Sequence, residues 1–206
     1  MFRPEAFQRT DESNDAAFYR APRFVYHIDE GAVKQVTALY RQYFSPHGDT
    51  LDLMSSWVSH FPEEMPLGRV AGLGMHAAEL NANPRLSEGV VHDLNRDPAL
   101  PFEDHVFDQA AICVSVDYLV QPLAVFDGLA RVLRPGAPLV VTFSNRCFPT
   151  KAIKAWLRLD DEQRIAWVKG YFSRTGPWYR VHEQVFRPQH GDPLYAVIGY
   201  AGTPSG

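Results

Sequence analysis

The fold is decided by one stretch of sequence: Thr50-Leu51-Asp52-Leu53-Met54-Ser55-Ser56-Trp57-Val58-Ser59-His60. Its first apolar residues predict a short buried strand, which stops at two small hydroxyl residues. An acidic residue, Asp52, lies near the carboxyl end of that strand. In an α/β protein a ligand lies at the carboxyl end of a central strand, where the strand order switches. We therefore expect a ligand site here.

Composition limits the class of protein. The chain has 206 residues, 46% hydrophobic and 21% charged, which predicts a single domain over residues 1–206. A net charge of −4 argues against general nucleic-acid binding. The two cysteines, Cys113 and Cys147, form no CxxC pattern, so we expect a reducing interior and no disulfide framework. No secretory signal and no membrane-spanning run is evident, and we expect a soluble, cytoplasmic protein.

The N-terminal 48 residues predict a helical lid region. Residues 1–14 are polar and aperiodic and are expected to be loose, and residues 18–28 form an irregular lead-in. Asp29 can cap a helix that runs to about Phe44, because apolar residues recur there at three-and-four spacing.

From residue 49 onward, apolar runs alternate with helical segments. They predict strands at residues 51–54, 69–73, 88–92, 107–114 and 138–143, helices at 75–81 and 122–134, one or two helices within 150–173, and a closing hairpin of 179–186 and 194–199. This order predicts an α/β fold: a doubly wound, mostly parallel, seven-stranded Rossmann-like sheet with helices on both faces and a C-terminal antiparallel hairpin. The α/β core would span residues 49–206, with a helical insertion at about 150–175.

Two strings carry a resemblance to a known family. Leu100-Pro101-Phe102-Glu103-Asp104-His105-Val106-Phe107-Asp108 is similar to the family run "LPF-x-D-x-x-FD", and Ala130-Arg131-Val132-Leu133-Arg134-Pro135-Gly136 is similar to "RVL-x-PGG". On these strings the sequence resembles class I S-adenosylmethionine-dependent methyltransferases of the small type-11-like group, over residues 49–143. The resemblance implies S-adenosyl-L-methionine as cofactor and methyl transfer to a small-molecule acceptor.

The same resemblance implies a set of cofactor-binding positions. It puts Asp52 near the amino group of the cofactor's methionine, Asp93 near the adenine amine, and residues 113–118 beside the sulfonium. The full set is Asp52, Met54, Ser55, Ser56, Gly74, Met75, Asp93, Leu94, Cys113 and Val114.

The sequence departs from the family pattern at two places. Met54, Ser56 and Val58 occupy the positions of the family's glycine-rich loop, where glycine allows positive φ. A side chain held at positive φ is strained by about 1–3 kcal/mol, so we expect this loop to take a different path. Gly74 stands where the family has an acid that binds the ribose hydroxyls, and no neighbour in sequence is an evident substitute.

Catalytic candidates follow the strand ends. Asp117 and Tyr118 come after the fourth strand, where such proteins often carry polar residues facing the acceptor, although Asp117 could equally cap a turn. His60 and His27 could face the site or be structural or surface residues. No HExxH spacing and no cysteine pair indicates a metal.

Other features leave the acceptor and the function class open. Residues 146–190 carry nine Lys/Arg against four Asp/Glu, which indicates either a docking face for an anionic substrate or a solvated helix face. Arg146 could pair with an anion or simply begin that face.

We expect the acceptor between the fourth strand, the N-terminal helix and residues 156–179. The main alternative is a non-catalytic binding or scaffold protein, favoured if Met54 and Trp57 fill the cofactor space. A methyltransferase acting on nucleic acid or protein is a further alternative. Oligomeric state is not predicted.

Overall fold

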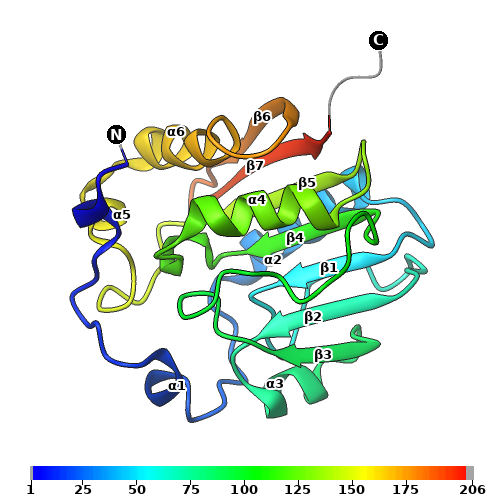
Figure 1. Cartoon of the computed structure of the whole chain (residues 1–206), viewed down its shortest axis with the longest axis horizontal. Helices are drawn as coiled ribbons and strands as arrows, with labels where there is room; N and C mark the ends of the chain where they lie inside the picture. The colour runs from blue at the N-terminus through cyan, green and yellow to red at the C-terminus, as the bar shows by residue number, and fades with distance from the viewer. Residues whose placement is uncertain (1, 203–206) are drawn as a thin grey trace.

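A computed structural model describes residues 2–202 and shows one seven-stranded sheet in the order β3-β2-β1-β4-β5-β7-β6 (Figure 1). The strands are β1 (Thr50–Leu53), β2 (Val70–Gly74), β3 (Glu88–Val91), β4 (Gln109–Cys113), β5 (Pro138–Phe143), β6 (Trp178–Phe186) and β7 (Leu194–Ala201). Neighbouring strands among β1 to β5 pair in parallel, while β7 pairs antiparallel with both β5 and β6. The predicted fold class is confirmed.

Helices lie on both faces of this sheet. On one face α2 (Glu30–Tyr43) packs Val36 and Tyr40 into a cluster with Val140 of β5. On the other face α4 (Pro122–Val132) and α6 (Asp161–Phe172) share a cluster with β4 and β5, next to the short α5 (Lys154–Arg158). The short α3 (Ala77–Ala82) packs against β2 and β3. Central strands covered on both faces read as continuous apolar runs, which is why β5 was recognisable in the sequence.

The helix limits follow local signals. The carboxylate of Asp29 accepts a hydrogen bond from the amide of Ala32 and caps α2, as expected. Pro122 opens α4, where its missing N–H is not needed, and Pro135-Gly136 follow its end. Local capping and turn chemistry was therefore sufficient to place these two helices.

Between β1 and β2 the chain forms no helix in residues 54–69. Pro62, Pro66 and Gly68 interrupt this stretch, and each disfavours a continuous helix. The side chains of Phe61 and Met65 pack under α2, so the loop itself covers part of the sheet. The loop that leaves β1 is thus held by packing and side-chain hydrogen bonds rather than by a helix of its own.

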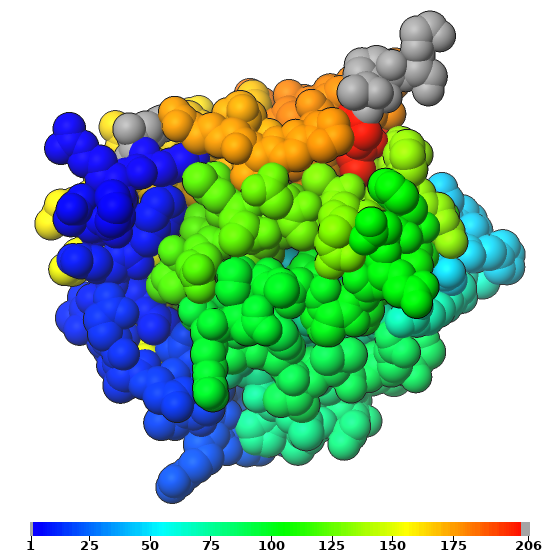
Figure 2. Space-filling model, viewed as in Figure 1, coloured from blue at the N-terminus to red at the C-terminus, as the bar shows by residue number. Residues whose placement is uncertain are grey.

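The expectation that residues 1–14 are loose is wrong for the part that the structure describes. Residues Pro4–Phe7 form a 3₁₀ turn, and the ring of Phe2 packs 4.6 Å from the ring of Trp167. Arg9 is buried and forms an ion pair of 2.7 Å with Asp15 at the start of α1 (Asp15–Phe18). The segment runs along the flank of the molecule, in blue in Figures 1 and 2. Met1 lies outside the described residues.

Within residues 2–202, no helix combines the length and the apolar character needed to cross a bilayer.

Candidate functional site

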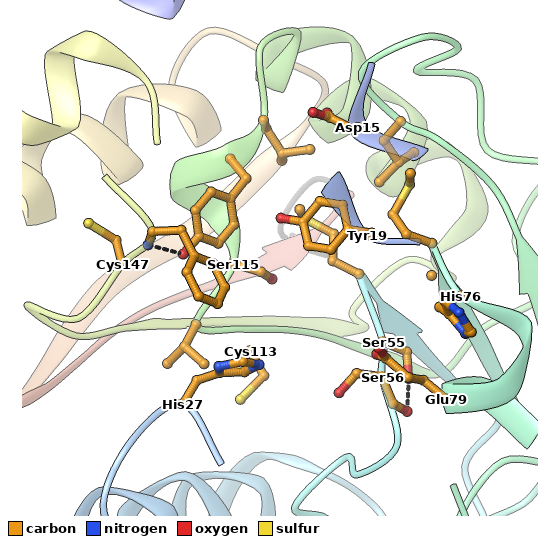
Figure 3. A pocket seen from close by; sticks show the side chains of 18 of the residues that line it. Asp15, Tyr19, His27, Ser55, Ser56, His76, Glu79, Cys113, Ser115 and Cys147 are labelled. Atoms are coloured by element: carbon orange, nitrogen blue, oxygen red, sulfur yellow. Dashed lines mark hydrogen bonds between the residues drawn. The ribbon is translucent and has the colours of Figure 1, made fainter. Parts of the chain in front are cut away.

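A cavity of about 560 Å³ opens at the carboxyl ends of β1 to β5 (Figure 3). Its walls come from the segments that follow those five strands, together with residues from the stretch 15–28. Ligand pockets in proteins commonly enclose roughly 300–1,000 Å³. All ten residues that the resemblance assigns to the cofactor line this one cavity. The parallel sheet explains this gathering, because the carboxyl ends of its strands share one edge.

Asp52 is the buried acid of the cavity, with 2% of its surface exposed. Its Oδ2 accepts hydrogen bonds from the hydroxyls of Ser55 and Ser59, both at 2.6 Å. Its Oδ1 accepts none from the described residues and remains available to a ligand. Burial raises the pKa of Asp52 to about 6, and the two serine hydroxyls oppose that rise. At neutral pH the carboxylate is therefore mainly charged and suited to a cationic group.

The same hydroxyls hold the loop after β1. The side-chain amide of Asn83 donates to the carbonyl of Ser56 at 2.9 Å and to the hydroxyl of Ser59 at 2.8 Å. Ser59 in turn donates to Asp52, so the end of β1, the loop and the end of α3 form one network. Buried, satisfied polar networks of this kind fix a single conformation.

Met54 adopts the left-handed backbone conformation, with φ of 58°. The loop was expected to avoid the backbone conformation of the family's glycine-rich loop. Met54 nevertheless makes the positive-φ turn that glycine usually makes, and the chain then continues without a helix. Among the six non-glycine residues with positive φ in the described chain, three line the cavity: Met54, His60 and Val114. Each such residue stores about 1–3 kcal/mol of strain, and such strain is typical of ligand sites.

Gly74 ends β2 directly beneath this loop. The amide of Ser55 donates to the carbonyl of Leu73 at 2.8 Å, which brings the loop onto the end of β2. A Cβ atom added at Gly74 would lie 2.2 Å from the carbonyl oxygen of Ser55. The path of the loop therefore excludes any side chain at position 74, acidic ones included.

Asp93 follows β3 and forms a turn with its own backbone. Its Oδ1 accepts hydrogen bonds from the amides of Asn95 at 3.0 Å and Arg96 at 3.3 Å. This local turn fixes the carboxylate at the cavity wall. Leu94, beside it, is buried and also lines the cavity.

No protein-family model matches the sequence, and no curated protein matches it significantly. Solved structures do match. The chain is similar to the [4+2]-cyclase SpnF, with a TM-score of 0.62 and 15% identity over 92% of each chain. It is also similar to a SAM-dependent methyltransferase from Aquifex aeolicus, with a TM-score of 0.56 and 14% identity over 96% of this chain and 99% of that one. The chain has the class I methyltransferase fold. A third match is Haemonchus contortus phosphoethanolamine N-methyltransferase 2 in complex with S-adenosyl-L-methionine, with a TM-score of 0.60 and 11% identity over 82% of this chain and 53% of that one.

In this methyltransferase fold the cavity at the strand ends is open. Met54 lies on the cavity wall, whereas Trp57 lies outside it. The Trp57 ring packs 5.1 Å from the ring of Tyr26, and its Nε1 donates to the carbonyl of Val25 at 3.3 Å. The filling of the cavity by Met54 and Trp57, which would have favoured a scaffold protein, does not occur.

Of the catalytic candidates Asp117, Tyr118, His60 and His27, all but Asp117 reach the cavity. His60 and Tyr118 line it, and so do His27, Asn145 and Arg146. Burial and the neighbouring His27 lower the pKa of His60 to about 4, so its imidazole is neutral at neutral pH.

Asp117 is not brought to the cavity. It is 2% exposed and lies outside the lining, because the 3₁₀ turn Val116–Tyr118 directs it into the interior. Burial raises the pKa of its carboxyl group to about 7. Its backbone carbonyl accepts from the amide of Ile153, so the residue joins two loops instead of facing an acceptor.

The segment 156–179 does not contribute to the cavity lining either. Trp156 is buried beneath Phe143, and two basic residues of the segment are paired, in the ion pairs Arg164–Asp161 and Lys169–Glu183. Residues 145–149 line the cavity in its place. The cavity lining therefore gives no support to an acceptor position against 156–179, because that segment covers the sheet.

Sequence analysis expected an N-terminal lid over residues 1–48, and the cavity lining takes Asp15, Tyr19 and residues 25–28 from that region, of which only His27 was a candidate. We call residues 15–28 the lid. The lid is held at one end by Asp15, which pairs with Lys151 at 3.1 Å and accepts from Asn95 at 2.9 Å. Lys151 is fully buried. The sequence analysis did not identify His76 and Glu79, which line the cavity beside Ser55 and Ser56 (Figure 3). Their one signal was their place after the second strand. Among the described residues, no three potential ligands gather as a metal site would require.

Proposed function

We propose that this protein transfers a methyl group from S-adenosyl-L-methionine to a small-molecule acceptor. The observation that carries the proposal is the single cavity at the carboxyl ends of β1 to β5 in a methyltransferase fold, lined by all ten expected cofactor positions. Bound there, the cofactor would supply a methyl group on a positively charged sulfur.

The residues present suit the chemical parts of this cofactor. Asp52 offers a buried carboxylate with one free oxygen, which suits the amino group of methionine. Asp93 offers a second carboxylate, fixed by its own turn, for the exocyclic amine of adenine. Cys113 ends β4, Val114 follows it, and both line the cavity. Methyl transfer then depends mainly on alignment, which a rigid cavity provides.

His60, Tyr118 and the lid would surround the acceptor. An imidazole that is neutral at pH 7 can accept a proton from an acceptor that must lose one. Among the described residues, none forms a hydrogen bond with the ring of His60. The ring of Tyr26, in the lid, packs with its centroid 5.7 Å from that of the His60 ring. These features support His60 as the proton acceptor for an acidic acceptor group, because its lowered pKa makes it a weak base.

Calorimetric titration with S-adenosylmethionine and S-adenosylhomocysteine tests the proposal. We expect micromolar binding by the wild-type protein. Asp52→Ala and Asp93→Ala, shown by circular dichroism to be folded, should each bind more weakly. Absence of binding at millimolar ligand refutes the proposal, and unchanged binding by both variants refutes the placement.

A second candidate function is binding or catalysis without methyl transfer. Two observations favour it: the loop after β1 lacks a helix, and a protein described as a [4+2]-cyclase has the same fold. A fold does not fix a reaction. No binding of the cofactor, with the fold intact, would support this alternative. The ion-paired basic segment gives little support to a nucleic-acid substrate, for which polyanion binding would weaken steeply with salt.

A further inference from the structure

The cavity holds a carboxylate with no assigned role. Glu79 lies on α3 and lines the cavity. Its Oε1 accepts a hydrogen bond of 2.7 Å from the backbone amide of Arg23 in the lid. Within residues 2–202, Glu79 has no ion-pair partner and its Oε2 accepts no hydrogen bond. One carboxylate oxygen is therefore available to a ligand.

The sheet order places Glu79 between the two other acids of the cavity edge. β2 lies between β1 and β3, and α3 follows β2 directly. Along the carboxyl edge the acids therefore follow the order Asp52, Glu79, Asp93. The cofactor has its amino acid, ribose and adenine in that order. With Asp52 at the amino group and Asp93 at adenine, the ribose falls at Glu79.

No other acid of the cavity can serve the ribose. Position 74 cannot carry a side chain, because the carbonyl oxygen of Ser55 occupies the space that a Cβ atom would need. The remaining lining acid, Asp15, is 6% exposed and bound by Arg9, Lys151 and the amide of Asn95. Glu79 is thus the one lining carboxylate that lies beside β2 and has an oxygen to offer.

We infer that Glu79 binds the ribose hydroxyls of the cofactor and, through the Arg23 amide, joins the bound cofactor to the lid. This inference rests on the proposed function. A carboxylate is an acceptor for two hydroxyl donors, and a vicinal diol presents two. The amide of Arg23 occupies Oε1, which leaves Oε2 to accept from a ligand while Oε1 holds the lid. The loop after β1 excludes an acid at Gly74, and Glu79, five residues later, supplies the carboxylate instead.

The experiment compares two ligands by calorimetry: S-adenosylhomocysteine and its analogue lacking both ribose hydroxyls. A hydrogen bond to a charged group is worth about 10- to 100-fold in affinity. Wild-type protein should bind the analogue that much more weakly. Glu79→Ala should bind S-adenosylhomocysteine about 10- to 100-fold more weakly than wild type, and should no longer distinguish the two ligands. Glu79→Gln keeps the shape of the side chain, and its affinity for S-adenosylhomocysteine should lie between those of wild type and Glu79→Ala.

The control is Glu63→Ala, since Glu63 is exposed and outside the cavity lining. It should behave as wild type, and circular dichroism should show all variants folded. If Glu79→Ala still distinguishes the ligands, or weakens both equally, the ribose role is overturned while the proposed function stands. If wild-type protein binds neither ligand at millimolar concentration, the proposed function fails and this inference fails with it.

Discussion

The substitution Asp52→Asn should separate stability from cofactor binding. Burial raises the pKa of Asp52 from its ordinary 3.8 to about 6. That difference of about 2 pKa units corresponds to about 3 kcal/mol of stability lost when the folded protein must hold the charge. Asparagine removes the charge but keeps an oxygen that can accept from both Ser55 and Ser59. We therefore expect Asp52→Asn to be about 1–3 kcal/mol more stable than wild type at pH 7.

The pH dependence gives the sign of the effect. Between about pH 4 and pH 6 the folded protein retains the Asp52 proton that the unfolded chain has already lost. This residue therefore makes wild-type stability fall as pH rises through that window, and the asparagine variant lacks this component. The difference between the two proteins should be largest at pH 7 and should disappear near pH 4.

Urea unfolding followed by circular dichroism at pH 4, 5, 6 and 7 measures this difference. The same variant should bind S-adenosylmethionine more weakly, because the ligand's ammonium group loses its carboxylate partner. Ser59→Ala is a useful counterpart: it removes a hydrogen bond to the charged form and the acceptor of the Asn83 side-chain amide, and it should cost about 2–3 kcal/mol at pH 7. A variant Asp52→Asn that is no more stable than wild type at pH 7, or a difference that stays constant from pH 4 to 7, refutes the reasoning.

Three further predictions concern the loop, the lid and the histidine. Gly74→Ala should cost at least about 2 kcal/mol in urea unfolding, because its Cβ would lie 2.2 Å from a loop carbonyl. Gly31→Ala at the exposed start of α2, where the added Cβ would lie 3.3 Å from the Asp29 side chain, should change stability by less than about 1 kcal/mol, and equal effects of the two substitutions would contradict the steric argument. NMR titration should show the imidazole of His60 ionising near pH 4, and the depressed pKa should make wild type, but not His60→Gln, lose stability as pH falls from about 6.5 to 4; a titration near 6.5 would contradict its burial. Lys151→Met should lower the free energy of unfolding by about 3 kcal/mol and expose the lid to proteolysis, because it removes a buried partner of Asp15. An unchanged unfolding midpoint would show that this ion pair does not stabilise the lid.

The strands and the helices α2 and α4 were predictable because their signals are local. Continuous apolar runs predicted β4 and β5, and an apolar face with an Asp29 cap predicted α2. The ends differed by a few residues: the expected strand 107–114 is Gln109–Cys113. The parallel order of the strands then brought the cofactor positions to one edge, since every parallel strand ends there.

The errors share one physical cause, which is contact between residues far apart in the sequence. The N-terminal residues looked loose because nothing local shows that Phe2 will meet Trp167 or that Arg9 will be buried with Asp15. Asp117 looked exposed to the acceptor because a strand end gives the edge of the sheet but not the direction of a side chain in the turn that follows.

By itself the sequence determined the order of strands and helices, the edge on which a ligand would lie and the acids at the ends of β1 and β3, because periodicity, caps and strand ends are properties of neighbouring residues. Only the tertiary structure decided which residues of the expected N-terminal lid line the cavity, that the Ser55 carbonyl excludes an acid at Gly74, and that Glu79 meets the Arg23 amide 56 residues away. Those outcomes depend on how loops pack over one another, and the free energy of that packing is distributed over contacts that no local pattern records.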